Sequence, residues 1–531
     1  MFNQLDLYAN TIIKMKPSQI FARVKKKLGL KSTIGMKVKE EYLSILLFQT
    51  PAELDFDNAF IGRFNADEFL NGKVTLLNEC EEFVWDGKWE VTNRSPLWNF
   101  NLHYFEYLMA YVNAYKKTQN KEYIEAIKTS INCWIKNNPK SKSGVGWSSY
   151  TISLRVVYWF SCLKELKSEF DDDFIERVTV SLYEQYKYLG EHLEIDIQAN
   201  HLLENLKAIV LCAIAFDDKL ILERALRELK NQCKEQILAD GMHFELSPMY
   251  HKIVLEALIR IAVALRGIGK KDLEIENYIQ SMIDVAYSFE QGTDRIPLFN
   301  DGGSNVAKSL RALLDAVKNH FEITPTFKAK LTYSGYFIYK WNDWKMIVDA
   351  GKPGPDYNPG HAHCDAMSYE LYYKGTPIIV NCGTYAYQCK ERSFFRSTAA
   401  HNTVMLDGDE QSQCWSVFRL GKRSNTRVIN EDDSGITMEM IDQNNNKSLR
   451  KIMIEEDRIY VEDISENHYI DSYLHILKNS CITINQIICE AKEYQQHLYA
   501  PEYGLCQKVD VIVIKGMSKV AYSIDLSVCC D

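Results

Sequence analysis

The chain of 531 residues is longer than one hydrophobic core usually supports, so its length favours two large domains. Apolar residues make up 46% and charged residues 25%, which is typical of a folded globular protein. A net charge of -9 argues against broad nucleic-acid binding, which needs an extended basic surface, so any anionic ligand would need basic residues gathered locally.

The amino-terminal segment lacks the apolar stretch and cleavage site of a secretory signal. The longest apolar run, Ala208 to Phe216, is much too short to cross a bilayer. We therefore expect a cytoplasmic protein. The 14 cysteines form no CxxC pair, which favours reduced thiols, although the adjacent Cys529 and Cys530 leave a zinc or disulfide role open.

A basic segment from Lys14 to Lys31 carries apolar residues at helical spacing, among them Phe21, Val24 and Leu28. This pattern favours a solvated first helix. The alternative is a helix that lies on an anionic membrane surface and contacts it peripherally.

The periodicity of the chain divides it into two regions. From about residue 100 to 320, apolar residues recur at intervals of three and four, and short polar connections predict antiparallel helices. From about residue 330, short runs rich in Val, Ile, Tyr and Thr alternate with turn signals and predict an antiparallel β-sandwich. The predicted fold is α+β, with residues 1–95 as an extension with the first helices, 96–325 as a helical domain and 326–531 as a β-domain.

Three polar residues begin one of the predicted helices. Asn200 lies four residues and His201 three residues before Glu204, so these groups share one polar face of a helix. The alternative is that Asn200 is the N-cap of the helix and His201 is merely solvated.

A strong helix start follows at Ser247 and Pro248, with the serine as N-cap. Tyr250 then lies in the first turn, where a phenol can face a cleft and the helix end offers positive potential. A lone tyrosine at such a position is usually structural, so it needs a partner to indicate chemistry.

The segment HAHCD places His361, His363 and Asp365 at every second position, and on a strand all three would share one face. Such a face suits a metal, a proton transfer or a polar surface. The preceding turn, residues 358–360, puts His361 near the domain boundary, where clefts form, and local hydrogen bonding of a loop is the alternative. His363 and His401 are candidates to meet across strands, where they could bind zinc.

Eight segments in order resemble the heparinase II/III-like polysaccharide lyases, over roughly residues 95 to 425. They are WNFNLHYFEYL, GWSSYTISLR, NHLLEN, DGMHFELSPMYH, LFNDGG, HAHCDAMSYELYYKG, GTYAY and RSTAAHNTVMLDG. The resemblance implies an (α/α) toroid of antiparallel helix pairs followed by the β-sandwich. It also implies β-elimination in a uronic-acid-containing anionic polysaccharide.

The resemblance further implies roles for single residues. Asn200 would bind the uronate carboxylate, whose charge must be neutralised before the C5 proton can leave. Tyr250 would give a proton to the glycosidic oxygen, and would also be the base in a syn elimination, whereas His361 would be the base on the other face. The predicted substrate-binding residues are His103, Trp147, Arg155, His201, Glu204 and Arg396.

Some members of this family bind a metal through a histidine, an aspartate and a second histidine. His363 and His401 match the two imidazoles, but Asn381 stands at the aspartate position. An amide is a weaker zinc ligand than a carboxylate, so either the site is empty or another group such as Asp365 substitutes. We expect no required cofactor, with a structural zinc in the β-domain as the alternative.

Basic residues concentrate near the last of these segments, where they would suit an anionic polysaccharide or form ordinary salt bridges. They are Lys390, Arg392, Arg396, Arg419, Lys422 and Arg423.

Three functions are compatible with these patterns. The leading one is a polysaccharide lyase, and the missing export signal would fit a role in capsule or exopolysaccharide synthesis. A uronate C5-epimerase, related in fold, would use the same site. A non-catalytic sugar-binding protein is disfavoured because Asn200, Tyr250 and His361 are all present.

Overall fold

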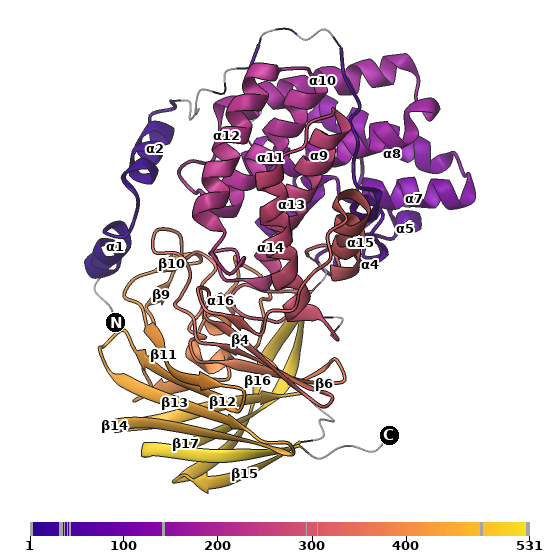
Figure 1. Cartoon of the computed structure of the whole chain (residues 1–531). Helices are drawn as coiled ribbons and strands as arrows, with labels where there is room; N and C mark the ends of the chain where they lie inside the picture. Colours follow the sequence, from indigo (N-terminus) through magenta and orange to yellow (C-terminus); the bar gives the residue numbers. More distant parts are fainter. Residues whose placement is uncertain are drawn as a thin grey trace.

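The computed structural model describes residues 4–30, 36, 38–39, 41, 44–85, 87–140, 144–293, 295–304, 306–477 and 482–526. Lys31, Cys529 and Cys530 lie outside the described residues. Helices fill the amino-terminal part of the chain and antiparallel strands the carboxyl-terminal part, and the two parts meet directly (Figure 1). The predicted order, helices first and sheets second, is confirmed.

The helical part is built around α11 (Ala199–Ala215), which contacts α9, α10, α12 and α13. Apolar residues occur on every side of α11 and nearly all of them are buried, as expected for a helix enclosed by others. The closure of the helix pairs into a toroid stays a prediction. The other main helices are α6 (Pro96–Tyr104), α7 (Leu108–Thr118), α8 (Glu122–Asn137), α9 (Ser149–Leu166), α10 (Asp172–Glu191), α12 (Lys219–Gln236), α13 (Pro248–Gly267), α14 (Leu273–Glu290) and α15 (Leu310–Phe321).

Smaller elements precede these helices. The N-terminal arm, which we define as α1 (Gln4–Ile12) and α2 (Pro17–Lys27), lies along the side of the molecule beside both parts (Figure 1). The others are α3 (Ala52–Asp55), α4 (Asn58–Ile61), α5 (Ala66–Leu70), β1 (Lys73–Leu76) and β2 (Glu79–Glu82).

The β-domain contains a sheet of 13 strands whose pairings are antiparallel. The long strands β14 and β17 pair with each other and with several neighbours, and buried side chains from β5, β12 and β17 share one apolar cluster. The strands are β3 (Lys330–Leu331), β4 (Tyr336–Trp341), β5 (Trp344–Asp349), β6 (Tyr369–Tyr373), β7 (Thr376–Ile379), β8 (Val404–Leu406), β11 (Asn425–Asp432), β12 (Gly435–Ile441), β13 (Lys447–Ile454), β14 (Arg458–Ile476), β15 (Ile482–Ile488), β16 (Ala491–Glu502) and β17 (Leu505–Leu526). A separate hairpin joins β9 (Cys414–Trp415) to β10 (Arg419–Leu420), and α16 (Arg392–Phe395) is a single short turn.

Local sequence signals act as predicted at α13 but not at the HAHCD segment. Ser247 caps α13 by accepting a hydrogen bond from the Tyr250 amide at 3.3 Å. Residues 361–365 form no strand, because the His363 amide donates to the Asn300 side chain at 3.1 Å rather than to a neighbouring strand. Among the described residues, we find no helix with the length and apolar character needed to span a bilayer.

Candidate active site

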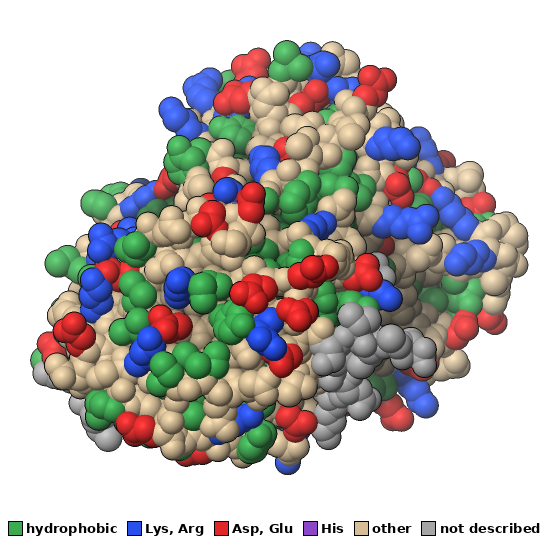
Figure 2. Space-filling model, turned by 60° about the horizontal axis from the view of Figure 1, so that its bottom comes forward, with side chains coloured by type: hydrophobic (Ala, Val, Ile, Leu, Met, Phe, Trp, Pro, Cys, Tyr) green, Lys and Arg blue, Asp and Glu red, His purple; other side chains and the backbone are tan. Residues whose placement is uncertain are grey.

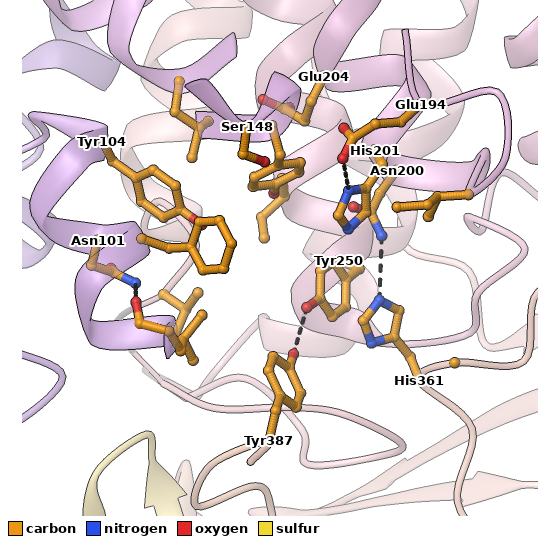
Figure 3. A pocket seen from close by; sticks show the side chains of 18 of the residues that line it. Asn101, Tyr104, Ser148, Glu194, Asn200, His201, Glu204, Tyr250, His361 and Tyr387 are labelled. Carbon is orange, nitrogen blue, oxygen red and sulfur yellow. Dashed lines mark hydrogen bonds and ion pairs between the residues drawn. The ribbon is translucent and has the colours of Figure 1, made fainter. Parts of the chain in front are cut away.

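A cavity of about 720 Å³ lies where the helices meet the β-domain. Its walls come from α6, α9, α11 and α13 and from the loops around residues 358–361, 387–388 and 416–419. Aromatic side chains line much of it, which suits stacking against sugar rings (Figure 3). This size and this position between two domains are typical of ligand-binding sites.

Asn200 lies in the first turn of α11 and lines the cavity, although its side chain is almost fully buried. Its Nδ2 atom donates to Glu245 Oε2 at 2.7 Å and lies 3.3 Å from His361 Nε2 (Figure 3). Its Oδ1 atom and Glu245 Oε1 are buried without a hydrogen-bond partner among the described residues. A sugar hydroxyl could donate to either oxygen, so the pair is a polar contact point inside the cavity.

His361 is oriented by a buried carboxylate. Its Nδ1 atom lies 2.9 Å from Asp301 Oδ2, an arrangement in which Nδ1 carries the proton and donates it to the carboxylate. The Nε2 atom then bears a lone pair, which faces Asn200 Nδ2 at 3.3 Å. This is the tautomer that a general base requires.

Tyr250 packs against His361 with ring centroids 3.8 Å apart and an interplanar angle of 28°. Its hydroxyl is hydrogen-bonded to the Tyr387 hydroxyl at 2.5 Å (Figure 3). The Tyr387 hydroxyl is in turn hydrogen-bonded to that of Tyr503 at 2.8 Å. Burial, together with nearby Tyr503 and Asp301, raises the pKa of Tyr250 well above its ordinary value. Tyr250 is therefore a neutral phenol with a proton to give.

Asp301 connects three loops of the domain boundary. Besides His361, it binds His363 Nε2 at 2.9 Å and both terminal nitrogens of Arg392. Burial alone would raise the pKa of Asp301, but the Arg392 charge and the two histidine hydrogen bonds hold that pKa well below its ordinary value. Asp301 therefore stays ionised and fixes the histidines around it.

His363 and His401 meet as expected, with His363 Nδ1 and His401 Nε2 3.2 Å apart. Asn381 Oδ1 contacts the opposite nitrogen of His401, Nδ1, at 3.2 Å, so this amide does not join the two imidazoles in one ligand set. Among the described residues, no group of three or more His, Cys, Asp or Glu side chains could hold a metal ion. This donor set does not fit the three-ligand site that the resemblance implies, because Asp365 instead accepts from the Asn300 amide.

His201 and Glu204 both line the cavity. His201 Nδ1 is 3.2 Å from Glu194 Oε1 (Figure 3). Burial would lower the pKa of His201, but the Glu194 carboxylate outweighs it and raises that pKa. Glu204 forms an ion pair with Lys207, so neither glutamate offers an uncompensated charge.

Four predicted substrate-binding side chains do not line this cavity; they lie in the protein interior instead, bonded mainly to backbone carbonyls. His103 Nε2 contacts the Trp89 carbonyl at 2.8 Å, and Trp147 Nε1 donates to the Asn138 carbonyl at 2.9 Å. Arg155 donates to Gln185 at 2.8 Å, and Arg396 donates to the carbonyls of residues 362, 416, 417 and 419. Their part is to hold neighbouring backbone in place.

Basic side chains are also distributed differently from the prediction. Of the six basic residues between 390 and 423, only Arg419 lines the cavity, whereas Arg392 binds Asp301. The N-terminal arm contributes Arg23 and Lys26 to the cavity instead. On the face shown in Figure 2, acidic and basic side chains are interspersed, so the local groups in the cavity decide how an anion is received.

On α2 of the N-terminal arm, the large apolar side chains face outward. Phe21 is 61% and Val24 49% exposed, whereas Gln19 and Ala22 are buried against the protein. Contact of this outer face with an anionic membrane stays a prediction.

Sequence reasoning missed four residues of the site, namely Glu245, Asp301, Tyr387 and Tyr503. Glu245, Asp301 and Tyr387 lie in the segments DGMHFELSPMYH, LFNDGG and GTYAY, which carry the family resemblance, and this position could have indicated them. Tyr503 lies outside every such segment.

Comparisons with known proteins give a consistent result. The family described as Heparinase II/III N-terminus matches residues 63–329, and the family described as Heparinase II/III-like, C-terminal, matches residues 324–483. A heparin-sulfate lyase of Pedobacter heparinus is 24% identical over 60% of this chain and 53% of its own length. One of Bacteroides thetaiotaomicron is 22% identical over 65% of this chain and 57% of its own length, so the match spans little more than half of these relatives.

Solved structures share the fold. A crystal structure of heparinase III has a TM-score of 0.69 at 15% identity, with 96% of this chain and 92% of that chain covered. A heparan sulfate lyase from Pedobacter heparinus has a TM-score of 0.54 at 17% identity, with 96% and 87% covered.

Proposed function

Because this chain belongs to the heparinase II/III-like family, we propose that it is a polysaccharide lyase acting by β-elimination on a uronic-acid-containing anionic polysaccharide. The names of its relatives, heparin-sulfate lyases, support this activity. The observation that carries the proposal is the stacked pair of His361 and Tyr250 in the interdomain cavity, with an oriented base beside a neutral acid.

The first step is removal of the C5 proton. This carbon lies next to the uronate carboxylate, so negative charge develops on the carboxylate oxygens as the proton leaves. Asn200 Nδ2 carries two hydrogens, of which one is donated to Glu245 and the other faces His361 Nε2. When a uronate binds, this second hydrogen turns to a carboxylate oxygen and leaves the Nε2 lone pair free. His361 takes the proton on Nε2, and the imidazolium that forms is stabilised by Asp301 across the 2.9 Å hydrogen bond.

The second step breaks the C4–O bond. The electron pair at C5 forms the C4=C5 double bond while the glycosidic oxygen leaves and receives the Tyr250 proton. Tyr387 can share its own proton with the resulting phenolate, and Tyr503 can do the same for Tyr387, across 2.5 and 2.8 Å. One proton is taken from the sugar and one is returned, so no co-reactant is needed.

The geometry favours the lyase over the epimerase. Inversion at C5 requires a proton acceptor and a proton donor on opposite faces of the sugar ring, whereas His361 and Tyr250 stack and approach from one side. The raised pKa of Tyr250 supports its role as acid rather than base. A place in capsule or exopolysaccharide synthesis is the setting we propose, and it depends on the expected cytoplasmic location alone.

One experiment separates these functions. The protein is incubated with a panel of uronic polysaccharides in heavy water, while the absorbance of unsaturated uronate and the deuterium at C5 are followed. New absorbance supports the lyase, deuterium uptake without it supports the epimerase, and binding without either supports the sugar-binding protein. If the panel gives absorbance with no member, the proposed lyase activity is wrong for these polymers.

A further inference from the structure

Among the described residues, six basic side chains line the cavity, and they differ in how their charge is balanced. They are Arg23, Lys26, Arg63, Lys207, Arg260 and Arg419. Four form ion pairs: Lys26 with Asp196 at 3.1 Å, Arg260 with Asp55 at 2.8 Å, Arg63 with Glu106 and Lys207 with Glu204. In the described part of the chain, no carboxylate oxygen lies within 4.0 Å of the Arg23 or Arg419 side-chain nitrogens.

The partners of Arg23 are uncharged. Its Nη2 atom lies 3.5 Å from the Asp196 carbonyl and Nη1 lies 3.4 Å from Met15 Sδ. Burial, and then the charge of Arg419, lower the pKa of Arg23, while Asp196 opposes them. Both guanidinium groups line the same cavity, and the charge of Arg23 is only partly compensated.

Both arginines are held in place by the N-terminal arm. Tyr8 of α1 packs against Trp415 of the β9–β10 hairpin with ring centroids 5.0 Å apart, and Trp415 Nε1 donates to Thr11 at 3.2 Å. On the other side, Gln19 of α2 donates to the Ile197 carbonyl at 3.3 Å. The arm thus joins the hairpin that carries Arg419 to the helical part, and Thr11 also donates to the carbonyl of Leu420, the next residue, at 3.3 Å. Arg23 and Arg419 line the same cavity.

These arginines are also close to the catalytic centre. Arg419 directly follows Phe418, whose ring centroid lies 5.0 Å from that of Tyr387 and 6.4 Å from that of His361. A group bound by the arginines would therefore belong to the sugar at the cleaved bond or to one of its near neighbours.

We propose that Arg23 and Arg419 form an oxyanion-binding subsite, the rim subsite, which binds a sulfate or carboxylate group of the polysaccharide beside the bond that is cleaved. Guanidinium groups bind such oxyanions through paired hydrogen bonds, and two uncompensated ones favour a ligand of at least one full negative charge. The assignment rests on the proposed function for the identity of the chain that carries the group. That Arg23 and Arg419 have no ion-pair partner among the described residues does not depend on the proposed function.

The test compares Arg23→Ala and Arg419→Ala with Lys27→Ala, a control on the same helix whose exposed side chain is outside the cavity. Each is made in the full chain with and without Tyr250→Phe, so that binding can be measured without turnover. The ligands are heparan sulfate oligosaccharides, their desulfated forms, and the desulfated forms with reduced carboxylates. Isothermal titration gives Kd, and unfolding temperatures show that each variant is folded.

We expect each arginine variant to weaken binding about tenfold, the usual effect of losing a hydrogen bond to a charged group, with KM raised and kcat nearly unchanged. The control keeps the parent Kd. If the subsite binds sulfate, the difference in Kd between the arginine variants and the control disappears with the desulfated ligand. If it binds a carboxylate, the difference disappears only when the carboxylates are also reduced. Equal losses on all three ligands, or arginine variants that behave like the control, overturn the subsite.

The two proposals fail separately. If no polymer is cleaved but the arginine variants still lose affinity for anionic ligands, the rim subsite stands and the lyase does not. If cleavage occurs with unchanged KM in both arginine variants, the lyase stands and the rim subsite does not.

Discussion

At the proposed catalytic centre, Asp301 is bound by two histidines and Arg392, whereas at the rim Arg23 and Arg419 have no ion-pair partner among the described residues. The two regions border one cavity. In the centre, the buried charge of Asp301 is paired with Arg392 and hydrogen-bonded to both histidines, which orients the proposed base. At the rim, charge is left uncompensated, so it is available to a ligand. Geometry and affinity are thus supplied by different parts of the same cavity.

The largest effect is expected at the reacting groups. Tyr250→Phe and His361→Ala should each lower kcat by about 10² to 10⁴ fold, the usual contribution of general acid–base catalysis, while Kd changes little. Initial rates of absorbance increase and titration of the same ligand provide the comparison. Tyr104→Phe, which removes another phenol of the cavity wall, is the control. A kcat loss of the same size in the control would contradict the assigned roles.

Asp301→Asn tests the compensated charge. It leaves the buried Arg392 guanidinium without its carboxylate, which typically costs about 3–5 kcal/mol in the free energy of unfolding. Asp356→Asn breaks a pair with Arg423 whose aspartate is 72% exposed, and it should cost no more than about 1 kcal/mol. Urea unfolding of both variants gives the difference. Equal losses in the free energy of unfolding would mean that the buried Asp301–Arg392 pair matters no more to stability than the exposed Asp356–Arg423 pair.

The pH dependence of stability sharpens the comparison further. Burial lowers the pKa of His251, the neighbour of Tyr250, to about 4, whereas an unfolded histidine titrates near about 6.5. Because the folded pKa is the lower one, the stability that depends on neutral His251 is complete above about pH 6.5 and is lost as the pH falls toward 4.

His251→Gln should therefore flatten the pH dependence of the free energy of unfolding between about pH 4 and 6.5, measured by urea unfolding across that range. No such flattening is expected from Lys27→Ala, because Lys27 is exposed and its substitution leaves His251 in place. If the free energy of unfolding of the glutamine variant depended on pH as steeply as that of the parent, groups other than His251 would be responsible for the pH dependence.

The smallest effect concerns metal. His363 and His401 offer two imidazoles rather than three donors, and neither step of the proposed reaction uses them as ligands. Treatment with a chelator should therefore leave kcat and the unfolding temperature unchanged. Loss of activity that zinc alone restores would show that a third donor completes the site.

Much of the fold followed from periodicity. Helical spacing up to about residue 320 and alternating strands after it are strong local signals, and both regions form as predicted. The strand predicted at 361–365 did not form, since its polar side chains bond to loops distant in sequence. Alternation alone cannot distinguish such a loop from a strand.

The sequence predicted three residues of the site but not the groups to which they are hydrogen-bonded. Asn200, Tyr250 and His361 come together in the cavity, yet the carboxylate that orients His361 is 60 positions away. His103 and Arg155 show the opposite problem, because a polar side chain in a helix is compatible with a cleft and with an interior contact to a carbonyl. The direction in which such a side chain points is decided by tertiary packing and cannot be read from its residue type.

The network around Asp301 also constrains how relatives of this chain can diverge. Asp301 is bound to His361, the proposed base, to His363 and to Arg392, so its substitution would leave at least one buried group without its partner. We expect natural sequences to keep or replace Asp301, His361, His363 and Arg392 as a set. Arg23 and Arg419, which depend on no buried partner, can be gained or lost singly, so substrate preference can evolve without disturbing the reaction.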